Sequence, residues 1–197
     1  MKKKIDTLIE DIYDLLEQGT NLNSIKNRDA LQNFGRVVAA AAKSALSEGK
    51  RERSKNLRMS QIGKPNRQLW YDMRSTNETQ ETLSGPTRLK FLYGEILEAL
   101  LVLLTEISGH EVTEQQKTVE VQGIKGHKDC RIDGTLVDIK SASSYAFKKF
   151  KEGTLALSDP FGYIAQISGY AEAEGDKTAA FFAVDKSSGE LALMTVD

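Results

Sequence analysis

The sequence predicts an α/β protein in which helices flank a mixed central sheet and a helical extension precedes this core. Apolar residues recur at helical spacing through long segments of the N-terminal half, and shorter strand-like segments follow in the C-terminal half. The expected order after the extension is helix, three strands, helix and two strands. A length of 197 residues and a hydrophobic content of 40% suit one domain with an appendage.

Two amphipathic helices are expected in the extension. Apolar residues at helical spacing predict helices over residues 4–18 and about 29–48, and a glycine ends each of them. A basic, polar linker follows. We therefore expect an N-terminal helical extension with its linker at residues 1–56 and a second domain at residues 57–197.

The longest expected helix opens at Ser84-Gly85-Pro86 and runs from residue 87 to about residue 108. Its apolar residues nearly surround it, so we expect a buried helix on which an acidic residue has a specific role. Strands are expected at residues 110–122, 126–132, 135–141, 178–184 and 191–196. Helices are expected at residues 143–151 and from residue 159 onward.

A two-residue hairpin turn is predicted at Asp133-Gly134, because both positions tolerate positive φ. This turn pairs Ile132 with Thr135, Arg131 with Leu136, Cys130 with Val137 and Asp129 with Asp138. The last pair places two carboxylates opposite each other. Lys140 follows on the same face, since strand side chains alternate. Asp133 is interpreted as a turn residue and not as a ligand.

Two acids that face each other across a ladder repel, so this hairpin needs a compensating cation. Lys140 balances only one of the two carboxylates. A hard divalent cation such as Mg²⁺ or Mn²⁺ binds oxygen ligands and leaves positions for a phosphate and a water. The hairpin therefore indicates metal-dependent hydrolysis of a phosphodiester.

These residues resemble the hallmark of the PD-(D/E)XK nucleases, an acid followed after a hairpin by acid-x-lysine: Asp129 and then Asp138-Ile139-Lys140. The resemblance is closest to the RecB-like and lambda-exonuclease-like branch. Gly94-Glu95-Ile96-Leu97-Glu98 is similar to its helical motif, and Gln166-Ile167-Ser168-Gly169-Tyr170 to its Gln-x-x-x-Tyr motif. The match covers roughly residues 57–197.

The resemblance implies an αβββαβ core and a site that holds one or two Mg²⁺ ions. Its ligands would be Glu98, Asp129, Asp138 and the backbone carbonyl of Ile139. Lys140 would position the attacking water and neutralise charge on the phosphate. Glu95 competes with Glu98 for the helical position. Gln166 and Tyr170 would line the site or grip substrate; the alternative is a helix that only packs on the sheet.

Basic residues are candidates for DNA contacts on both sides of the motif: Arg58, Lys64, Arg67, Lys148 and Lys149. The alternative for the lysine run is a solvated face. A short helix is expected to start at Pro65. Its Trp70 is interpreted as a buried core anchor in preference to a base-stacking residue.

Composition narrows the class of protein. The net charge of −1 excludes a global attraction to nucleic acid, so any contact depends on local basic residues. The single cysteine, Cys130, excludes an intramolecular disulfide and a cysteine-ligated zinc or iron–sulfur site built from this chain alone. In this the chain departs from the CRISPR-associated RecB-like nucleases, several of which carry a cysteine-ligated cluster. The lack of a long apolar segment and of a signal-like start favours a cytoplasmic protein with no membrane contact.

The function expected from the resemblance is a Mg²⁺-dependent exonuclease that acts on DNA ends, of phage or recombination and repair type. The alternatives are a restriction or junction-resolving endonuclease, and a DNA-binding or assembly module of the same fold without chemistry. DNA, a single-strand annealing or recombination protein, and further copies of the chain are the expected partners. The extension could pack on the core, close a DNA channel or mediate assembly.

Overall fold

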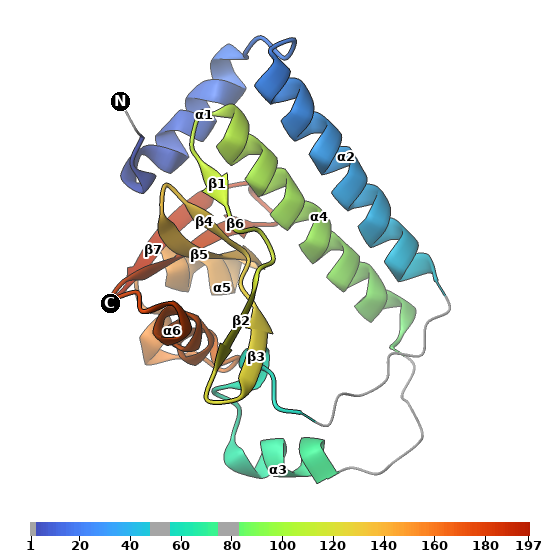
Figure 1. Ribbon diagram of the computed structural model, residues 1–197, viewed down its shortest axis with the longest axis vertical. Helices are drawn as coiled ribbons and strands as arrows, with labels where there is room; N and C mark the ends of the chain where they lie inside the picture. The colour runs from blue at the N-terminus through green and yellow to red at the C-terminus, as the bar shows by residue number, and fades with distance from the viewer. Residues whose placement is uncertain (1–2, 48–55, 75–82) are drawn as a thin grey trace.

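A mixed five-stranded sheet organises the chain, with strand order β1-β4-β5-β6-β7 (Figure 1). The computed structural model describes residues 3–47, 56–74 and 83–197, so most of the expected basic linker lies outside the described residues. β5 and β6 are parallel, and the other neighbours are antiparallel. The strands are β1 (Val112–Thr113), β4 (Cys130–Ile132), β5 (Thr135–Ala142), β6 (Ala179–Asp185) and β7 (Leu191–Val196). The predicted mixed α/β class is confirmed.

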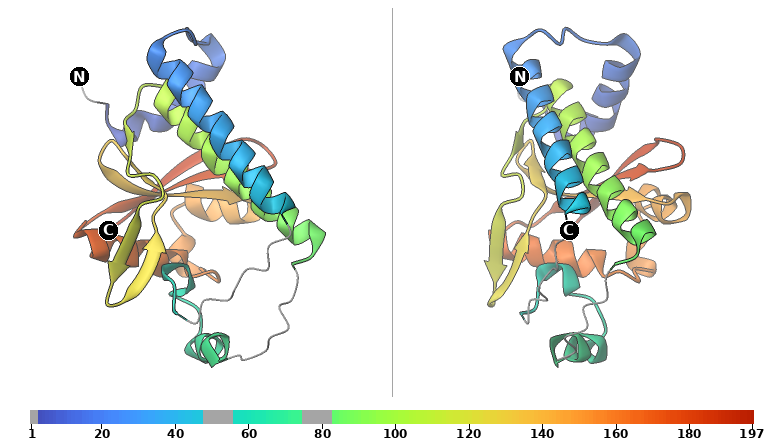
Figure 2. Two further views of the ribbon diagram at one scale, coloured as in Figure 1. Left: turned by 45° about the vertical axis from the view of Figure 1, so that its right-hand side comes forward. Right: turned by 90° about the vertical axis from the view of Figure 1, so that its right-hand side faces the viewer.

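The helices lie on both faces of this sheet (Figures 1 and 2). They are α1 (Leu8–Gln18), α2 (Ile25–Leu46), α3 (Asn66–Arg74), α4 (Gly85–Ile107), α5 (Ser144–Lys151) and α6 (Tyr163–Glu174), with single 3₁₀ turns at Ile5–Thr7, Met59–Gln61 and Leu155–Leu157. Ser24 and Ser84 cap α2 and α4, because their hydroxyls accept hydrogen bonds from the backbone N–H groups of Asn27 and Thr87. The helices predicted near 4–18, 29–48, 87–108 and 143–151 are confirmed.

The strand predicted at residues 110–122 is wrong as a single element. Positive φ angles at Glu114 and Gln116 turn the chain after β1, and the chain then enters a separate two-stranded sheet. That sheet pairs β2 (Thr118–Val121) with β3 (Ile124–His127). The strand predicted at 126–132 is likewise divided between β3 and β4. The break is at Lys128, whose fully buried ammonium forms ion pairs with Glu114 and Glu174.

Alternation along β5 separates two hydrophobic clusters. Leu136 and Ala142 join residues of α5 and α6 on one face, including Phe147 and Ile167. Val137 and Ile139 join residues of α1 and α4 on the other face. Side chains in a strand alternate between its two faces, so Asp138 and Lys140 point to the same α6 face as Leu136. There they are charged residues among apolar ones.

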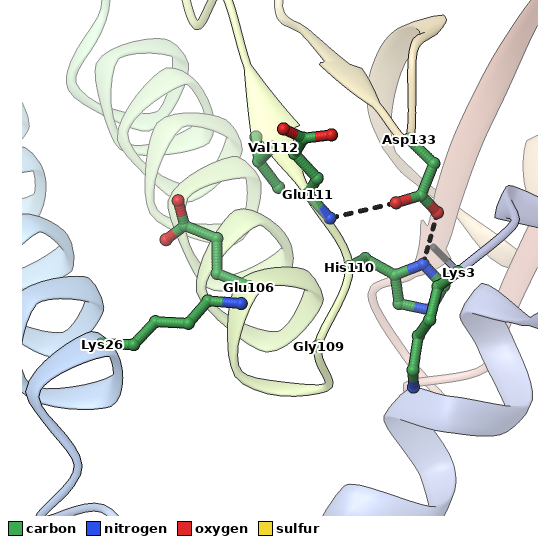
Figure 3. Close-up of a pocket in the computed structure, with 8 residues that line it drawn as sticks. All are labelled: Lys3, Lys26, Glu106, Gly109, His110, Glu111, Val112 and Asp133. Atoms are coloured by element: carbon green, nitrogen blue, oxygen red, sulfur yellow. Dashed lines mark hydrogen bonds and ion pairs between the residues drawn. The ribbon is translucent and has the colours of Figure 1, made fainter. Parts of the chain in front are cut away.

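Helix α1 packs directly on the core. Leu8 and Ile12 are fully buried, and the Tyr13 hydroxyl accepts a hydrogen bond from the backbone N–H of Leu191 at 2.8 Å. Asp11 Oδ2 lies 3.0 Å from Nε2 of the buried His110, whose Nδ1 lies 2.6 Å from Asp133 Oδ2. Figure 3 shows Asp133 between His110 and the backbone of Glu111. The turn residue Asp133 thus also ties the hairpin to the end of α4.

Helix α3 is less buried than the sequence suggested. It lies at the end of the molecule opposite α1 (Figure 1). Trp70 is 49% exposed, and Tyr71 and Met73 are exposed as well, so the interpretation of Trp70 as a core residue is wrong. Trp70 contacts Tyr71 edge to face and carries the Arg74 guanidinium 4.7 Å from its ring centre. No helix within the described ranges combines the length and hydropathy needed to span a bilayer.

The contact between α1 and the core should depend on pH. Hydrogen bonds from Lys3 and Thr7 lower the pKa of Asp11 from 3.8 to about 2. A folded-state pKa below the unfolded value adds stability above pH 3.8, and this is lost as the pH falls toward 2. We expect Asp11→Asn to lower the free energy of unfolding by about 0.5–1 kcal/mol at pH 7, as for partly exposed ion pairs. Urea unfolding should show this difference vanish near pH 2; a difference that is constant with pH would contradict it.

Candidate active site

The site lies where β5 extends beyond β4. The register of the hairpin is as predicted for three pairs, Ile132–Thr135, Arg131–Leu136 and Cys130–Val137, and the described ladder ends there. Asp133 and Gly134 both have positive φ, as the turn requires. The predicted fourth pair, Asp129 with Asp138, is not a ladder pair. From Asp138 onward, the edge of β5 that faced β4 is therefore available to side chains.

Asp129 caps this edge. Its Oδ2 accepts a hydrogen bond from the backbone N–H of Ile139 at 2.7 Å. In a strand the N–H and C=O of one residue point to the same edge. The carbonyl of Ile139 is therefore directed toward the side on which Asp129 lies, the direction that a backbone metal ligand at this position requires.

Asp138 and Lys140 form an ion pair on the α6 face of β5. The Asp138 side chain is 4% exposed and that of Lys140 18%. Within the described residues, Asp138 Oδ2 makes no well-formed hydrogen bond besides this ion pair. Lys140 is thus the partner that the described residues offer this buried oxygen, and a carboxylate oxygen can accept more than one such contact.

Glu98 reaches the same edge from α4, one turn beyond Gly94, which lies beside Ser141 of β5. A Cβ at Gly94 would meet Ser141 Oγ at 3.9 Å, an ordinary contact, so the absence of a side chain is not what permits this approach. Glu98 is partly buried, whereas its competitor Glu95 is exposed. The structure therefore brings Glu98, and not Glu95, furthest into the protein.

Gln116 connects two of the acids. Its backbone N–H donates to the carbonyl of Asp129 at 2.9 Å, and its side-chain amide donates to Glu98 Oε1 at 2.7 Å. The positive φ of Gln116 allows this turn of the chain. Sequence analysis missed this residue, since no local pattern distinguishes it from its neighbours.

Burial and nearby charges raise the pKa of Asp129 and of Glu98. Burial, and then the charges of Asp138 and Glu98, raise the pKa of Asp129 well above its ordinary value. Burial and the charge of Asp138 also raise the pKa of Glu98, against the hydrogen bond from Gln116. Burial lowers the pKa of Lys140, but the charges of Asp138 and Asp129 outweigh it and the pKa is raised. Lys140 is therefore a cation, and the site holds more acid than this one cation balances.

Helix α6 closes the other side of the site. Lys140 Nζ lies 4.8 Å from the ring centre of Tyr163. Gln166 donates from Nε2 to the Tyr170 hydroxyl at 3.3 Å, and Tyr170 is 3% exposed. Tyr163, Gln166 and Tyr170 recur at helical spacing on one face, a periodicity that could have identified Tyr163 from the sequence.

The donor set fits a hard divalent cation. Carboxylate oxygens, and a backbone carbonyl directed to the same edge, are ligands that Mg²⁺ prefers. Within residues 3–47, 56–74 and 83–197, no three His, Cys, Asp or Glu side chains already converge as a metal-binding group. Glu98 would have to exchange its hydrogen bond with Gln116 in order to join Asp129 and Asp138.

The basic candidates fall in two places. Arg58 and Lys64 flank the 3₁₀ turn at Met59–Gln61, and Arg67 lies on α3. Lys148 and Lys149 lie on α5, where Lys148 pairs with Glu152 and Lys149 donates to Ser158. The free thiol of Cys130 is buried in the cluster beneath α4, and burial raises its pKa.

Comparison of the sequence with protein-family models and with curated proteins finds no match.

Tyr170 depends on a glycine in the neighbouring sheet. A Cβ at Gly126 would lie 2.4 Å from Met59 Cβ and 2.7 Å from Tyr170 Cε1. We expect Gly126→Ala to destabilise the fold by about 1–3 kcal/mol in urea unfolding, because these neighbours must move. The control is Gly35→Ala in α2, where a Cβ meets nothing within 4 Å; it should add up to about 1 kcal/mol of stability. Equal stability of Gly126→Ala and wild type would contradict this packing.

Proposed function

We propose that the protein is a Mg²⁺-dependent DNA exonuclease of the PD-(D/E)XK superfamily, in its RecB-like and lambda-exonuclease-like branch. The observation that carries the proposal is the grouping of Asp138, Asp129 and Lys140 where β5 extends beyond β4, with one ammonium beside two carboxylates. Burial and the repulsion of nearby charges raise the pKa of Asp129 and of Glu98, and the contacts with Lys140, Gln116 and the Ile139 N–H offset only part of this cost. A cation that binds there would offset it.

In this proposal Glu98, Asp129, Asp138 and the Ile139 carbonyl would hold Mg²⁺, with Mn²⁺ as a substitute. The ion supplies Lewis acidity toward the scissile phosphate and its leaving oxygen. Lys140, held as a cation by Asp138, donates hydrogen bonds that orient a water for in-line attack and offset charge on the phosphate. Tyr163 covers its ammonium and keeps it close to Asp138.

Gln116 and Tyr170 position this machinery. Gln116 fixes Glu98 relative to Asp129 through its two hydrogen bonds. Burial raises the pKa of Tyr170, as do the charges of Asp138 and Asp129, against the hydrogen bond from Gln166. With Gln166 as its donor, the buried Tyr170 hydroxyl holds this face of α6 in place beside the site.

The catalytic proposal is tested with Lys140→Ala on end-labelled linear DNA and on covalently closed circular DNA, in Mg²⁺ and in EDTA. We expect wild type to degrade linear DNA only in Mg²⁺, and Lys140→Ala to lose about 10²–10³-fold in kcat, as for loss of one transition-state donor. Lys4→Ala, at an exposed lysine on the N-terminal segment, is the control and should keep full activity.

Other outcomes reassign the function. Cutting of circular DNA would make the protein an endonuclease. DNA binding without cutting of either substrate would make it a non-catalytic module of the same fold. Thermal unfolding of each variant separates loss of chemistry from loss of folding.

The DNA surface that we propose includes α3. Here Arg74 lies over Trp70, and Arg67 lies 5.9 Å from the ring centre of Tyr71. Exposed aromatic rings with adjacent guanidinium groups suit the stacking and phosphate contacts of a DNA strand. On α5, Lys148 and Lys149 are already bonded to Glu152 and Ser158, so they would have to exchange those contacts.

We expect the double variant Arg67→Ala, Arg74→Ala to weaken DNA binding. The slope of log affinity against log salt concentration should also become shallower, by the amount expected for the loss of about two phosphate contacts. Fluorescence anisotropy over a range of salt concentrations measures both quantities. Arg28→Ala, an exposed arginine near the start of α2, is the matched control and should change neither. If the α3 variant kept the wild-type salt slope, α3 would not be part of the DNA surface.

A further inference from the structure

An exposed aromatic residue that none of the sequence motifs includes lies close to Lys140. Phe161 belongs to the connection between α5 and α6, and it is 64% exposed. Its ring stacks on that of Tyr163, with the ring centres 5.4 Å apart and the planes inclined by 26°. The Tyr163 ring in turn lies 4.8 Å from Lys140 Nζ. Two aromatic rings therefore lead from solvent to Lys140.

Tyr163 gives the exposed ring a rigid support. Its own ring also contacts those of Phe150 and Phe181, at 6.2 and 6.4 Å between centres, and both of these phenylalanines are buried. Phe161 thus stacks on a residue that the core holds in place. A ring that is fixed in this way and still open to solvent can accept a second flat partner at little cost in conformational entropy.

Phe161 belongs to a larger exposed surface. Tyr145 of α5 and Leu157 of the connection after α5 are even more exposed than Phe161. Lys149 lies between them, because its Nζ is 5.3 Å from the Tyr145 ring centre and donates to the carbonyl and hydroxyl oxygens of Ser158. Both acceptors are neutral, so they do not balance the charge of Lys149. Single exposed apolar residues are ordinary, whereas a group of them beside a cation indicates a binding surface.

Two glycines bring another basic segment to this surface. Gly63, which precedes Lys64, packs against Gly162, which follows Phe161. A Cβ at Gly63 would lie 2.7 Å from the Cα of Gly162, so the two backbones are in direct contact. The segment that leads into α3 therefore lies against the start of α6 (Figure 2). Phe161 is thus next to the chain that carries the aromatic and arginine residues of α3.

The charges in this part of the surface favour an anionic ligand. Lys64 and Lys149 come from two different segments, and both lie near Phe161 in the fold. The acid of the same connection, Asp159, uses Oδ2 to accept a hydrogen bond from the backbone N–H of Ile164, and its Oδ1 is buried. Aromatic rings for the bases and ammonium groups for the phosphates are the combination that binds a single strand of nucleic acid.

We propose that Phe161 is a base-stacking residue. Its exposed ring receives the nucleobase that adjoins the phosphate held at Lys140, and Lys149 contacts a neighbouring phosphate. This inference rests on the proposed function and adds to it a nucleotide subsite on the connection between α5 and α6. Every base has a π-face, so this subsite does not select a sequence.

The test compares three substitutions of one side chain. Phe161→Ala removes the ring, Phe161→Leu keeps an apolar side chain without a ring, and Phe161→Tyr keeps an aromatic ring. Leu16→Ala is the matched control, because Leu16 is 60% exposed and lies on α1, at the end of the molecule opposite α3 (Figure 1). Exposed side chains contribute little to stability, so thermal unfolding of all four variants should resemble that of wild type.

Binding is measured by fluorescence anisotropy in EDTA with two labelled strands of equal length, an oligothymidylate and a strand of abasic deoxyribose phosphates. We expect Phe161→Ala and Phe161→Leu to bind oligothymidylate about tenfold more weakly, as for the loss of one base stack. On the abasic strand both should stay within about twofold of wild type, as surface substitutions do. Phe161→Tyr and Leu16→Ala should match wild type on both strands. The salt dependence should not change, because no charge is lost.

A second readout separates binding from chemistry. In Mg²⁺ with linear DNA, Phe161→Ala should raise KM by the factor seen in binding and leave kcat nearly unchanged, since a stack present before and during the reaction contributes equally to both states. A loss confined to kcat would overturn the inference, because it would place Phe161 in the chemical step.

The remaining outcomes are distinct. An equal loss of affinity on the two strands would mean that Phe161 acts through folding or phosphate contacts, and this would overturn the inference. Unchanged affinity of Phe161→Ala for oligothymidylate would also overturn it and would leave the exposed rings to a protein partner. Neither result touches the proposed function if wild type degrades linear DNA in Mg²⁺. A wild-type protein that neither binds oligothymidylate nor cuts DNA in Mg²⁺ would overturn the proposed function together with the inference.

Discussion

The repulsion among buried acids at the free edge of β5 is the constraint on which the site depends. The charge of Asp138 raises the pKa of Asp129 and of Glu98, the charge of Glu98 also raises the pKa of Asp129, and the charges of Asp138 and Asp129 act on Lys140. A carboxylate removed from water without compensation is costly. Such an arrangement persists in a fold only if the surrounding packing imposes it, so the rest of the structure can be understood as the means that hold these acids together.

Three separate supports impose it. The Asp133-Gly134 turn fixes the register of β4 and β5, and Asp133 also binds His110 and the backbone after α4. Gln116 then links Glu98 on α4 to the backbone of Asp129. On the other face, Gly126 leaves room for Tyr170, which fixes α6 against the small sheet. Each support joins two elements distant in the chain, so the site can form only after the tertiary fold has formed.

The sequence predicted what depends on local patterns. Helix spacing located α1, α2 and α4, and the Asp-Gly turn gave the correct register of three hairpin pairs. The sequence-based predictions were wrong where tertiary contacts override local secondary-structure propensity. The ion pairs of Lys128 divide a predicted strand between two sheets, and the exposure of Trp70 depends on where α3 lies. Gln116 could not be predicted, because its role is to connect two residues that only the fold brings together.

In our proposal, the elements around the acids decide which DNA the site can accept. An active site at a sheet edge is in itself open to a continuous duplex, and acid-x-lysine chemistry does not distinguish a strand end from an internal phosphate. The distinction must come from what surrounds the acids. Here Tyr163 of α6 covers Lys140 on one side, and a cavity between α2 and α4, with both apolar and acidic lining residues, adjoins the acids on the other side. In our proposal, the choice between a strand end and an internal phosphate therefore depends on α2, α4 and α6, the helices that border the acids.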